Sequence, residues 1–324
     1  MKKQSTITLS ILLGIIIAAQ VFIFSTRTDS VPDHKVTQQN PRIYAPALPD
    51  TMSFAGEPVP LDIYYVREGL DREMIVNTFG HTNTILYFKR AHRFFPIIEP
   101  ILKKHGVPSD FKYLCVIESG LTNATSPAKA QGFWQFIKAT GQKYGLEVND
   151  EIDMRNHLEA STEAACKYLK SLHDRFGSWT AAAAAYNCGE NGLQKNMERQ
   201  SIETYYDTRL NNETTRYVYR ILAVKQIMQH PQSYGFYLRS SDLYPSIPTR
   251  TANLTGQNVD LYNFAKENGT TYKMLRELNP WITTDKLTNK SNKTYTVKLP
   301  VKNGTSLSHI RTDRDKGTEY ITKM

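Results

Sequence analysis

A short apolar segment that ends in a carboxylate constrains this chain more than any other feature. Phe111, Leu114 and Ile117 indicate the buried face of a helix that begins near Ser109, and Glu118 follows directly. Burial disfavours the charged form of a carboxyl group and raises its pKa, which is what a general acid needs near neutral pH. The alternative is a helix-terminal glutamate that faces water, and position alone favours that alternative.

Several motifs that follow Glu118-Ser119 in a fixed order reverse this preference. The main ones are Ser126-Pro127, Gly132-Phe133-Trp134-Gln135-Phe136-Ile137, Ala184-Ala185-Tyr186-Asn187 and Arg216-Tyr217-Val218. With this order and spacing, residues 84–235 resemble the lytic transglycosylases, specifically the membrane-bound lytic transglycosylase D type. The loop between Glu118 and Gly132 is slightly shorter than in some relatives, which leaves the role of Ser126 open.

The resemblance implies a mainly α fold with a lysozyme-like catalytic domain, which we expect over residues 81–239. The hydrophobic pattern agrees, because strand signals are scarce and helices are predicted. The predicted helices span residues 84–104, 109–118, 133–144, 156–176, 180–187 and 213–229. Pro96 and Pro100 are expected to bend or break the first of them. Five consecutive alanines before Tyr186 allow another helix to approach closely.

By resemblance, one glutamate performs the chemistry without a second carboxylate. Glu118 protonates the glycosidic oxygen, and its carboxylate then accepts a proton from the C6 hydroxyl of the same N-acetylmuramyl residue. Tyr186 places its hydroxyl near the Glu118 carboxyl, whereas Gln135, Asn187 and Ser126 contact the substrate. The ordinary structural alternatives are a core aromatic for Tyr186, an exposed amide for Gln135 and a helix C-cap for Asn187. For Asn187 and Ser126 both interpretations stay open.

The resemblance implies a peptidoglycan lytic transglycosylase that cleaves the β-1,4 bond between N-acetylmuramic acid and N-acetylglucosamine and leaves a 1,6-anhydro-muramyl end. A goose-type lysozyme that uses water and a non-catalytic peptidoglycan-binding scaffold are the alternatives. We expect no cofactor and no metal. The three cysteines have no metal-ligand spacing. The acidic cluster Asp150, Glu151 and Asp153 lacks the ligand alternation of a calcium loop and is interpreted as a solvated loop.

The C-terminal part predicts a small α+β module. Residues 240–256 are interpreted as a linker, and two helix-like stretches and the strand-like segment 295–300 follow within residues 257–300. This order resembles a divergent LysM module, which binds peptidoglycan, although the usual Gly-Asp-Thr-Leu start is absent. A structural appendage is the alternative. The composition of residues 301–324 predicts a disordered tail.

The N-terminal part indicates export. An apolar run within residues 1–25 follows Lys2-Lys3 and gives about 27 Å of helix, enough to cross a bilayer. We expect an uncleaved membrane anchor, with a cleaved signal sequence as the alternative, and a spacer and pre-domain segment over residues 26–80. The expected location is the periplasmic face of the cell envelope. The net charge of +9 suits an anionic polymer or a membrane and could equally suit nucleic acid, but no nucleic-acid-binding signature is present. The expected partners are peptidoglycan glycan strands, as the resemblance implies.

Overall fold

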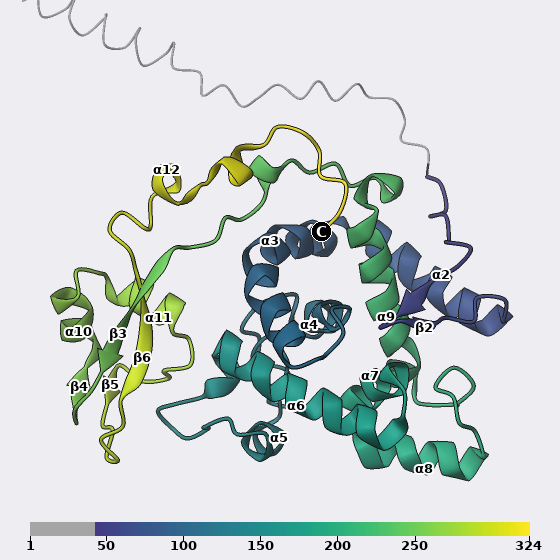
Figure 1. Ribbon diagram of the computed structural model, residues 1–324, viewed down its shortest axis with the longest axis horizontal. Helices are drawn as coiled ribbons and strands as arrows, with labels where there is room; N and C mark the ends of the chain where they lie inside the picture. The colour runs from purple at the N-terminus through teal and green to yellow at the C-terminus, as the bar shows by residue number, and fades with distance from the viewer. Residues whose placement is uncertain (1–42) are drawn as a thin grey trace, which may run out of the picture. The chain divides into compact units, whose positions relative to one another are not determined.

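The computed structural model, which describes residues 43–324, surrounds the short helix α4 (Phe111–Ser119) with longer helices (Figure 1). Helices α3 (His81–Lys104) and α9 (Asn212–Gln229) both pack against α4. All residues of α4 from Phe111 to Ile117 are buried. The apolar composition of this segment therefore reflects a helix with neighbours on all sides, and only its last turn reaches the surface.

Further helices belong to this domain. They are α2 (Tyr64–Phe79), α5 (Lys138–Lys143), α6 (Leu158–Phe176), α7 (Trp179–Cys188) and α8 (Glu190–Gln200). Helix α7 packs against both α6 and α9, and its alanines, residues 181–185, are buried. Small side chains let these helix backbones approach closely, as the alanine run predicted. The expected mainly α fold is confirmed.

In the helical domain the sequence prediction missed or misplaced four helices, α2, α3, α5 and α8. Helix α3 runs unbroken through Pro96 and Pro100, whereas the segment predicted as a helix over 133–144 is helical only in α5. Helix α2 was not predicted at all. It packs along α9, and its buried residues Val66, Leu70 and Met74 follow a spacing of four residues.

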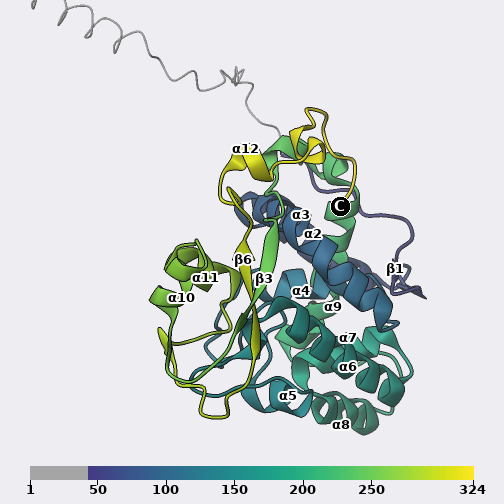
Figure 2. The same cartoon turned by 60° about the vertical axis from the view of Figure 1, so that its left-hand side comes forward.

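The C-terminal module is built on an antiparallel pair of strands. Strand β3 (Thr249–Leu254) pairs with β6 (Tyr295–Pro300), with Thr249 opposite Pro300 and Leu254 opposite Tyr295. Helices α10 (Leu261–Glu267) and α11 (Tyr272–Leu278) lie beside this pair, with α11 packed on β6 (Figure 2). Its core is separate from that of the helical domain and includes Leu254, Leu275, Trp281 and Val297. Because β3 supplies half of the strand pair, the module begins at Thr249, inside the segment interpreted as a linker.

Short strands and 3-10 helices complete the described part of the chain. The strands are β1 (Ser53–Phe54) paired with β2 (Glu57–Pro58), and β4 (Val259–Asp260) paired with β5 (Lys286–Leu287). The 3-10 helices are η1 (Met154–Asn156), η2 (Pro231–Tyr234), η3 (Ser240–Asp242) and η4 (Asp313–Lys316).

The residues after 300 are ordered against the helical domain, contrary to the disorder that their composition predicted. Helix α12 (Leu307–Ile310) precedes η4. In η4 the Oδ1 atom of Asp315 lies 2.7 Å from Nε2 of His92, and both residues are buried. Further on, the backbone N–H of Met324 donates to the carbonyl of Met228 at 2.9 Å. These pairings involve residues far apart in sequence, so local composition does not reveal them.

The expected anchor or signal sequence at residues 1–25 lies outside the described residues, as does the first part of the expected spacer. Within residues 43–324, none of the helices has both the length and the apolar character needed to cross a membrane.

Candidate active site

The carboxyl group of Glu118 stands in the last turn of α4, where the buried helix meets the surface. Gly120 ends the helix with a left-handed backbone, φ 59°, which suits a residue without a Cβ atom. Glu118 is partly exposed, and its Oε1 atom accepts a hydrogen bond from the hydroxyl of Tyr217. Burial raises the pKa of Glu118 to about 7, although this hydrogen bond and the charge of Arg220 act to lower it. A carboxyl group with this pKa is available in both protonation states near neutral pH.

Helix α9 supplies the tyrosine that touches this carboxyl group. Tyr217 is only 2% exposed, and the side chain of Asn211 caps the start of α9 by accepting from the backbone N–H of Thr214. One turn further along, Nη2 of Arg220 donates to the carbonyl of Ile117 at 3.1 Å. Two side chains of α9 therefore fix the end of α4, one through the carboxyl group of Glu118 and one through the backbone before it.

Tyr186, which was expected to place its hydroxyl near the Glu118 carboxyl group, makes its hydrogen bond to the neighbouring turn. Its hydroxyl donates to the backbone carbonyl of Trp134 at 2.7 Å. Burial, followed by the charge of Glu118, raises the pKa of this hydroxyl well above its ordinary value. Tyr186 thus lies near Glu118, but the hydroxyl bonded to Glu118 belongs to Tyr217. The motif Arg216-Tyr217-Val218 was visible in the sequence, yet spacing alone does not say which tyrosine meets the carboxylate.

Gln135 lies in a strained turn rather than in the predicted helix. Its φ of 48° is left-handed, an uncommon value for a residue with a side chain. Its Nε2 atom donates to the carbonyls of Ala124 at 2.9 Å and Gly132 at 2.8 Å. Both amide hydrogens are therefore committed to the loop, and the carbonyl oxygen of the side chain is the atom that remains to accept from a ligand.

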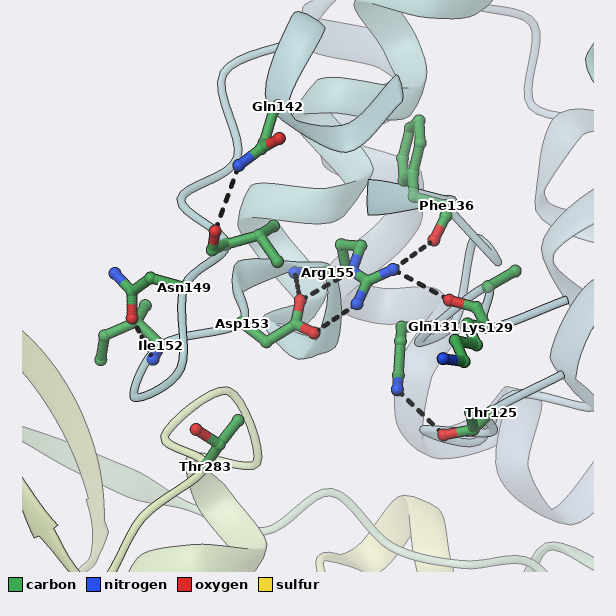
Figure 3. A network of polar contacts seen from close by, with 12 residues as sticks. Thr125, Lys129, Gln131, Phe136, Gln142, Asn149, Ile152, Asp153, Arg155 and Thr283 are labelled. Atoms are coloured by element: carbon green, nitrogen blue, oxygen red, sulfur yellow. Dashed lines mark hydrogen bonds and ion pairs between the residues drawn. The ribbon is translucent and has the colours of Figure 1, made fainter. Parts of the chain in front are cut away.

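A buried arginine holds this turn in place (Figure 3). Nη1 of Arg155 donates to the carbonyls of Lys129 at 3.0 Å and Phe136 at 3.1 Å, and Nη2 pairs with Asp153 at 2.6 Å. A Cβ atom on Gly132 would lie 2.0 Å from the carbonyl oxygen of Arg155, so only glycine fits there. Asp153 is buried in this ion pair, which corrects its interpretation as part of a solvated loop.

Asn187 and Ser126 make contacts that hold their own surroundings. Oδ1 of Asn187 accepts from the hydroxyl of Thr214 at 2.8 Å, and its Nδ2 donates to Glu213 at 3.3 Å. This links the end of α7 to the start of α9. Oγ of Ser126 accepts from the backbone N–H of Ala130 at 3.0 Å, which closes the loop between them. Any substrate contact by these two residues stays a prediction.

Across residues 43–324, no group of three or more histidine, cysteine or acidic side chains is arranged to hold a metal ion.

Comparison with known proteins agrees with the division into a helical domain and a small module. Residues 95–207 match the Transglycosylase SLT domain, and residues 250–303 match the Soluble lytic transglycosylase C-terminal LysM-like domain. The chain is 31% identical over 202 residues to Membrane-bound lytic murein transglycosylase D of Escherichia coli strain K12, and equally to the protein of that name from strain O6:H1. The alignment covers 60% of this chain but 44% of each relative, so the chain spans less than half of their length. The chain is thus homologous to these proteins and carries an SLT domain followed by a LysM-like domain.

Proposed function

We propose that this protein is a lytic transglycosylase that cleaves peptidoglycan between N-acetylmuramic acid and N-acetylglucosamine and leaves a 1,6-anhydro-muramyl end. The observation that carries the proposal is the environment of Glu118, whose carboxyl pKa of about 7 suits an acid that must also act as a base. The match to the SLT domain and the homology to a murein transglycosylase support the same reaction class.

In the first step Glu118 gives its proton to the glycosidic oxygen, and the bond from that oxygen to C1 of the muramyl residue breaks. The C6 hydroxyl oxygen of the same sugar forms a new bond to C1, and its proton passes to the Glu118 carboxylate. The acid is regenerated and no water is consumed. An internal nucleophile is already positioned, so a second catalytic carboxylate is unnecessary. The acetamido group at C2 assists by stabilising C1 after the bond breaks.

The other site residues act on this cycle in different ways. The Tyr217 hydroxyl stabilises the Glu118 carboxylate after proton transfer and keeps it aimed at the substrate. Tyr186 acts through the carbonyl of Trp134, since it holds the turn that carries Gln135. The free carbonyl oxygen of Gln135 accepts from the N–H of a sugar acetamido group, and Asn187 and Ser126 line the glycan path.

Hydrolysis is the second candidate, because a further carboxylate lies near enough to influence Glu118. The charge of Glu213 contributes to raising the pKa of Glu118, and Glu213 itself is held by Asn187. Many glycosidases use two carboxylates, one of which activates a water molecule. In that case Glu213 would act as the base for water, and the product would carry a reducing end.

Digestion of purified peptidoglycan in H₂¹⁸O separates the two reactions. The proposal predicts anhydro-muropeptides that are one water lighter than lysozyme products and contain no ¹⁸O. Reducing-end products with one ¹⁸O at C1 would establish hydrolysis instead. Absence of any cleavage by the folded protein, with binding to peptidoglycan retained, would establish the non-catalytic scaffold.

We also propose that the LysM-like domain binds peptidoglycan and that residues 1–25 anchor the protein at the membrane, with the catalytic domain on the periplasmic face. The match of residues 250–303 supports the first statement, and the apolar run after Lys2-Lys3 supports the second. Sequencing the N-terminus of the mature protein tests the anchor, because a start after residue 20 would show that the apolar run is a cleaved signal.

A further inference from the structure

A hairpin of the helical domain reaches into the LysM-like module. Residues 147–155 form this hairpin, with Val148 opposite Asp153. At its tip the backbone N–H of Asn149 donates to the carbonyl of Ile152 at 2.8 Å. Ile152 is only 1% exposed and belongs to the hydrophobic core of the module. Separating the hairpin from the module would expose this side chain, so apolar burial holds the two together.

Hydrogen bonds from the module fix the tip of the hairpin. The backbone N–H of Thr283 donates to the carbonyl of Glu151 at 2.9 Å, and the hydroxyl of Thr283 donates to the carbonyl of Asp150 at 2.7 Å. The carboxylate of Glu151 accepts from the backbone N–H of Thr288 at 2.8 Å. Because two of these bonds are made to backbone carbonyls, they hold the path of the hairpin as well as one of its side chains.

Asp153 joins the module to the active-site turn. Its backbone N–H donates to the carbonyl of Trp281, in the module, at 2.7 Å. Its carboxylate accepts from Arg155, from Nε at 2.8 Å and from Nη2 at 2.6 Å. Arg155 in turn donates from Nη1 to the carbonyls of Lys129 and Phe136 (Figure 3). The contacts therefore run without a gap from the module through two buried side chains to the loop that carries Gln135.

The turn depends on contacts of this kind for its shape. Gln135 has a left-handed φ of 48°, a conformation that persists only where the surrounding structure holds it. The carbonyl oxygen of Arg155 packs against Gly132, where a Cβ atom would lie 2.0 Å from it. Arg155 thus touches the turn through its backbone and its side chain, so a shift of the hairpin also shifts the turn.

We propose that the LysM-like module positions the active-site turn, and that Ile152 and Glu151 are the positioning residues through which it acts. Both act through the Asp153–Arg155 pair on the turn that carries Gln135. The inference rests on the proposed function for the role of Gln135 in holding the substrate. A module that only captured glycan would change KM alone. A module that positions the turn also sets kcat, because a bound sugar must be aligned with the catalytic acid before it reacts.

The first test measures kcat and KM of full-chain variants on a soluble tetrasaccharide prepared from peptidoglycan. Glu151→Ala removes the carboxylate that binds the module at Thr288. We expect its kcat to fall about fivefold with little change in KM, because the turn is less well positioned. Glu267→Ala is the matched control. It alters an exposed glutamate of the module that has no hydrogen bond or ion pair within residues 43–324, and it should keep the wild-type kcat. Unchanged kcat in Glu151→Ala, or an equal fall in both variants, would overturn the proposal.

The second test follows the turn itself by hydrogen exchange. Its reporters are the backbone N–H groups of Gln131 and Gly132, which donate at 3.0 Å to the carbonyls of Phe136 and Ala124 respectively. Ile152→Ala should speed the exchange of both groups about tenfold, because the hairpin loses its apolar anchor in the module. Ile152→Val keeps most of the buried side chain and should leave the exchange close to the wild-type rate.

A second alanine variant separates positioning of the turn from loosening of the module. Leu275→Ala removes a fully buried side chain of the same core from α11, outside the hairpin. It should destabilise the module as Ile152→Ala does but leave exchange in the turn unchanged. Wild-type exchange in Ile152→Ala, or an equal rise in both alanine variants, would overturn the proposal. Because exchange is read without turnover, this result stands whether or not the product analysis in H₂¹⁸O supports the proposed reaction.

Discussion

Two glutamates whose carboxyl groups lie at helix ends, Glu118 and Glu57, show how the same side chain acquires opposite properties in one domain. Both are partly exposed. Glu57 belongs to strand β2, and its carboxylate reaches the start of α7. There it accepts from the N–H groups of Trp179 at 2.5 Å and Thr180 at 2.9 Å and from the hydroxyls of Ser178 at 2.9 Å and Thr180 at 2.6 Å. Glu118 sits at the end of α4 and accepts from one hydroxyl, that of Tyr217.

The number and kind of donors decide the direction of each pKa shift. Burial acts to raise the pKa of Glu57, but the hydrogen bonds from Thr180, Trp179 and Ser178 outweigh it and hold the pKa below its ordinary value. The N-terminus of a helix also favours negative charge. For Glu118 burial outweighs the single strong donor, and the pKa rises to about 7. The carboxylate of Glu57 is therefore surrounded by donors, whereas the carboxyl group of Glu118 accepts from a single hydroxyl.

The largest effect is expected for the catalytic reaction itself. Glu118→Gln removes the proton donor but keeps the shape of the side chain, so turnover on purified peptidoglycan should fall about 10³-fold or more. Glu57→Gln is the matched control and should retain nearly full activity. Near wild-type turnover by Glu118→Gln would show that Glu118 is not the acid, and circular dichroism checks that both variants are folded.

The second prediction concerns the stability of Glu118→Gln. A raised carboxyl pKa means that the folded state holds the proton more tightly than the unfolded chain does. The stability linked to this proton is fully present below pH 4.5, the ordinary value, and is lost as pH rises through about 7. Glu118→Gln should therefore be more stable than the wild type at pH 8 by about 1–3 kcal/mol and similar to it at pH 4. Denaturant unfolding at both pH values measures this, and a constant difference would contradict it.

The third prediction separates the two tyrosines. The Tyr217 hydroxyl favours the ionised form of Glu118, so Tyr217→Phe should raise the pKa of Glu118 further and move the alkaline limb of kcat/KM to higher pH. It should also slow turnover about tenfold, since one charge-assisted hydrogen bond is lost. Tyr186→Phe removes a hydrogen bond to the carbonyl of Trp134 and none to Glu118. The alkaline limb of kcat/KM for this variant should therefore stay at the wild-type pH. Equal shifts in both variants would mean that Tyr186 is the partner of the carboxyl group.

The smallest effect is expected at Glu57. Glu57→Gln replaces a carboxylate that caps α7, and at pH 7 it should destabilise the protein by about 1 kcal/mol. Because folding lowers the pKa of Glu57, its carboxylate contributes stability at pH values above the ordinary pKa of glutamate. This contribution is lost as pH falls through the lower pKa that Glu57 has in the folded state. The difference from the wild type should therefore shrink in acid, opposite to Glu118→Gln. A difference that grows in acid would refute the comparison.

The sequence was informative wherever local pattern determines structure. The helices α6 and α9, the module helices α10 and α11 and strand β6 were all predicted close to their observed bounds. Their periodicity or alternation is strong, and α10, α11 and β6 are bounded by turn residues. The local pattern of an apolar helix ending in a carboxylate drew attention to Glu118, but the resemblance carried by the later motifs decided in favour of a catalytic role.

Sequence reasoning failed where distant residues decide the conformation. The helix predicted over 133–144 was started too early, because nothing near its first residues reveals that Arg155 takes up the carbonyl of Phe136. Tyr217 was not assigned to the site because its contact with Glu118 spans 99 positions. Helix α2 was missed because its stabilising partner, α9, lies far along the chain.

Direct titration of the Glu118 carboxyl group tests the central claim. The infrared difference spectrum between the wild type and Glu118→Gln isolates the stretch of the protonated carboxyl group, which disappears as the group ionises. The account predicts a midpoint near pH 7. A midpoint at or below the ordinary value of 4.5 would show that Glu118 is ionised at neutral pH, like Glu57, and that it does not supply the proton.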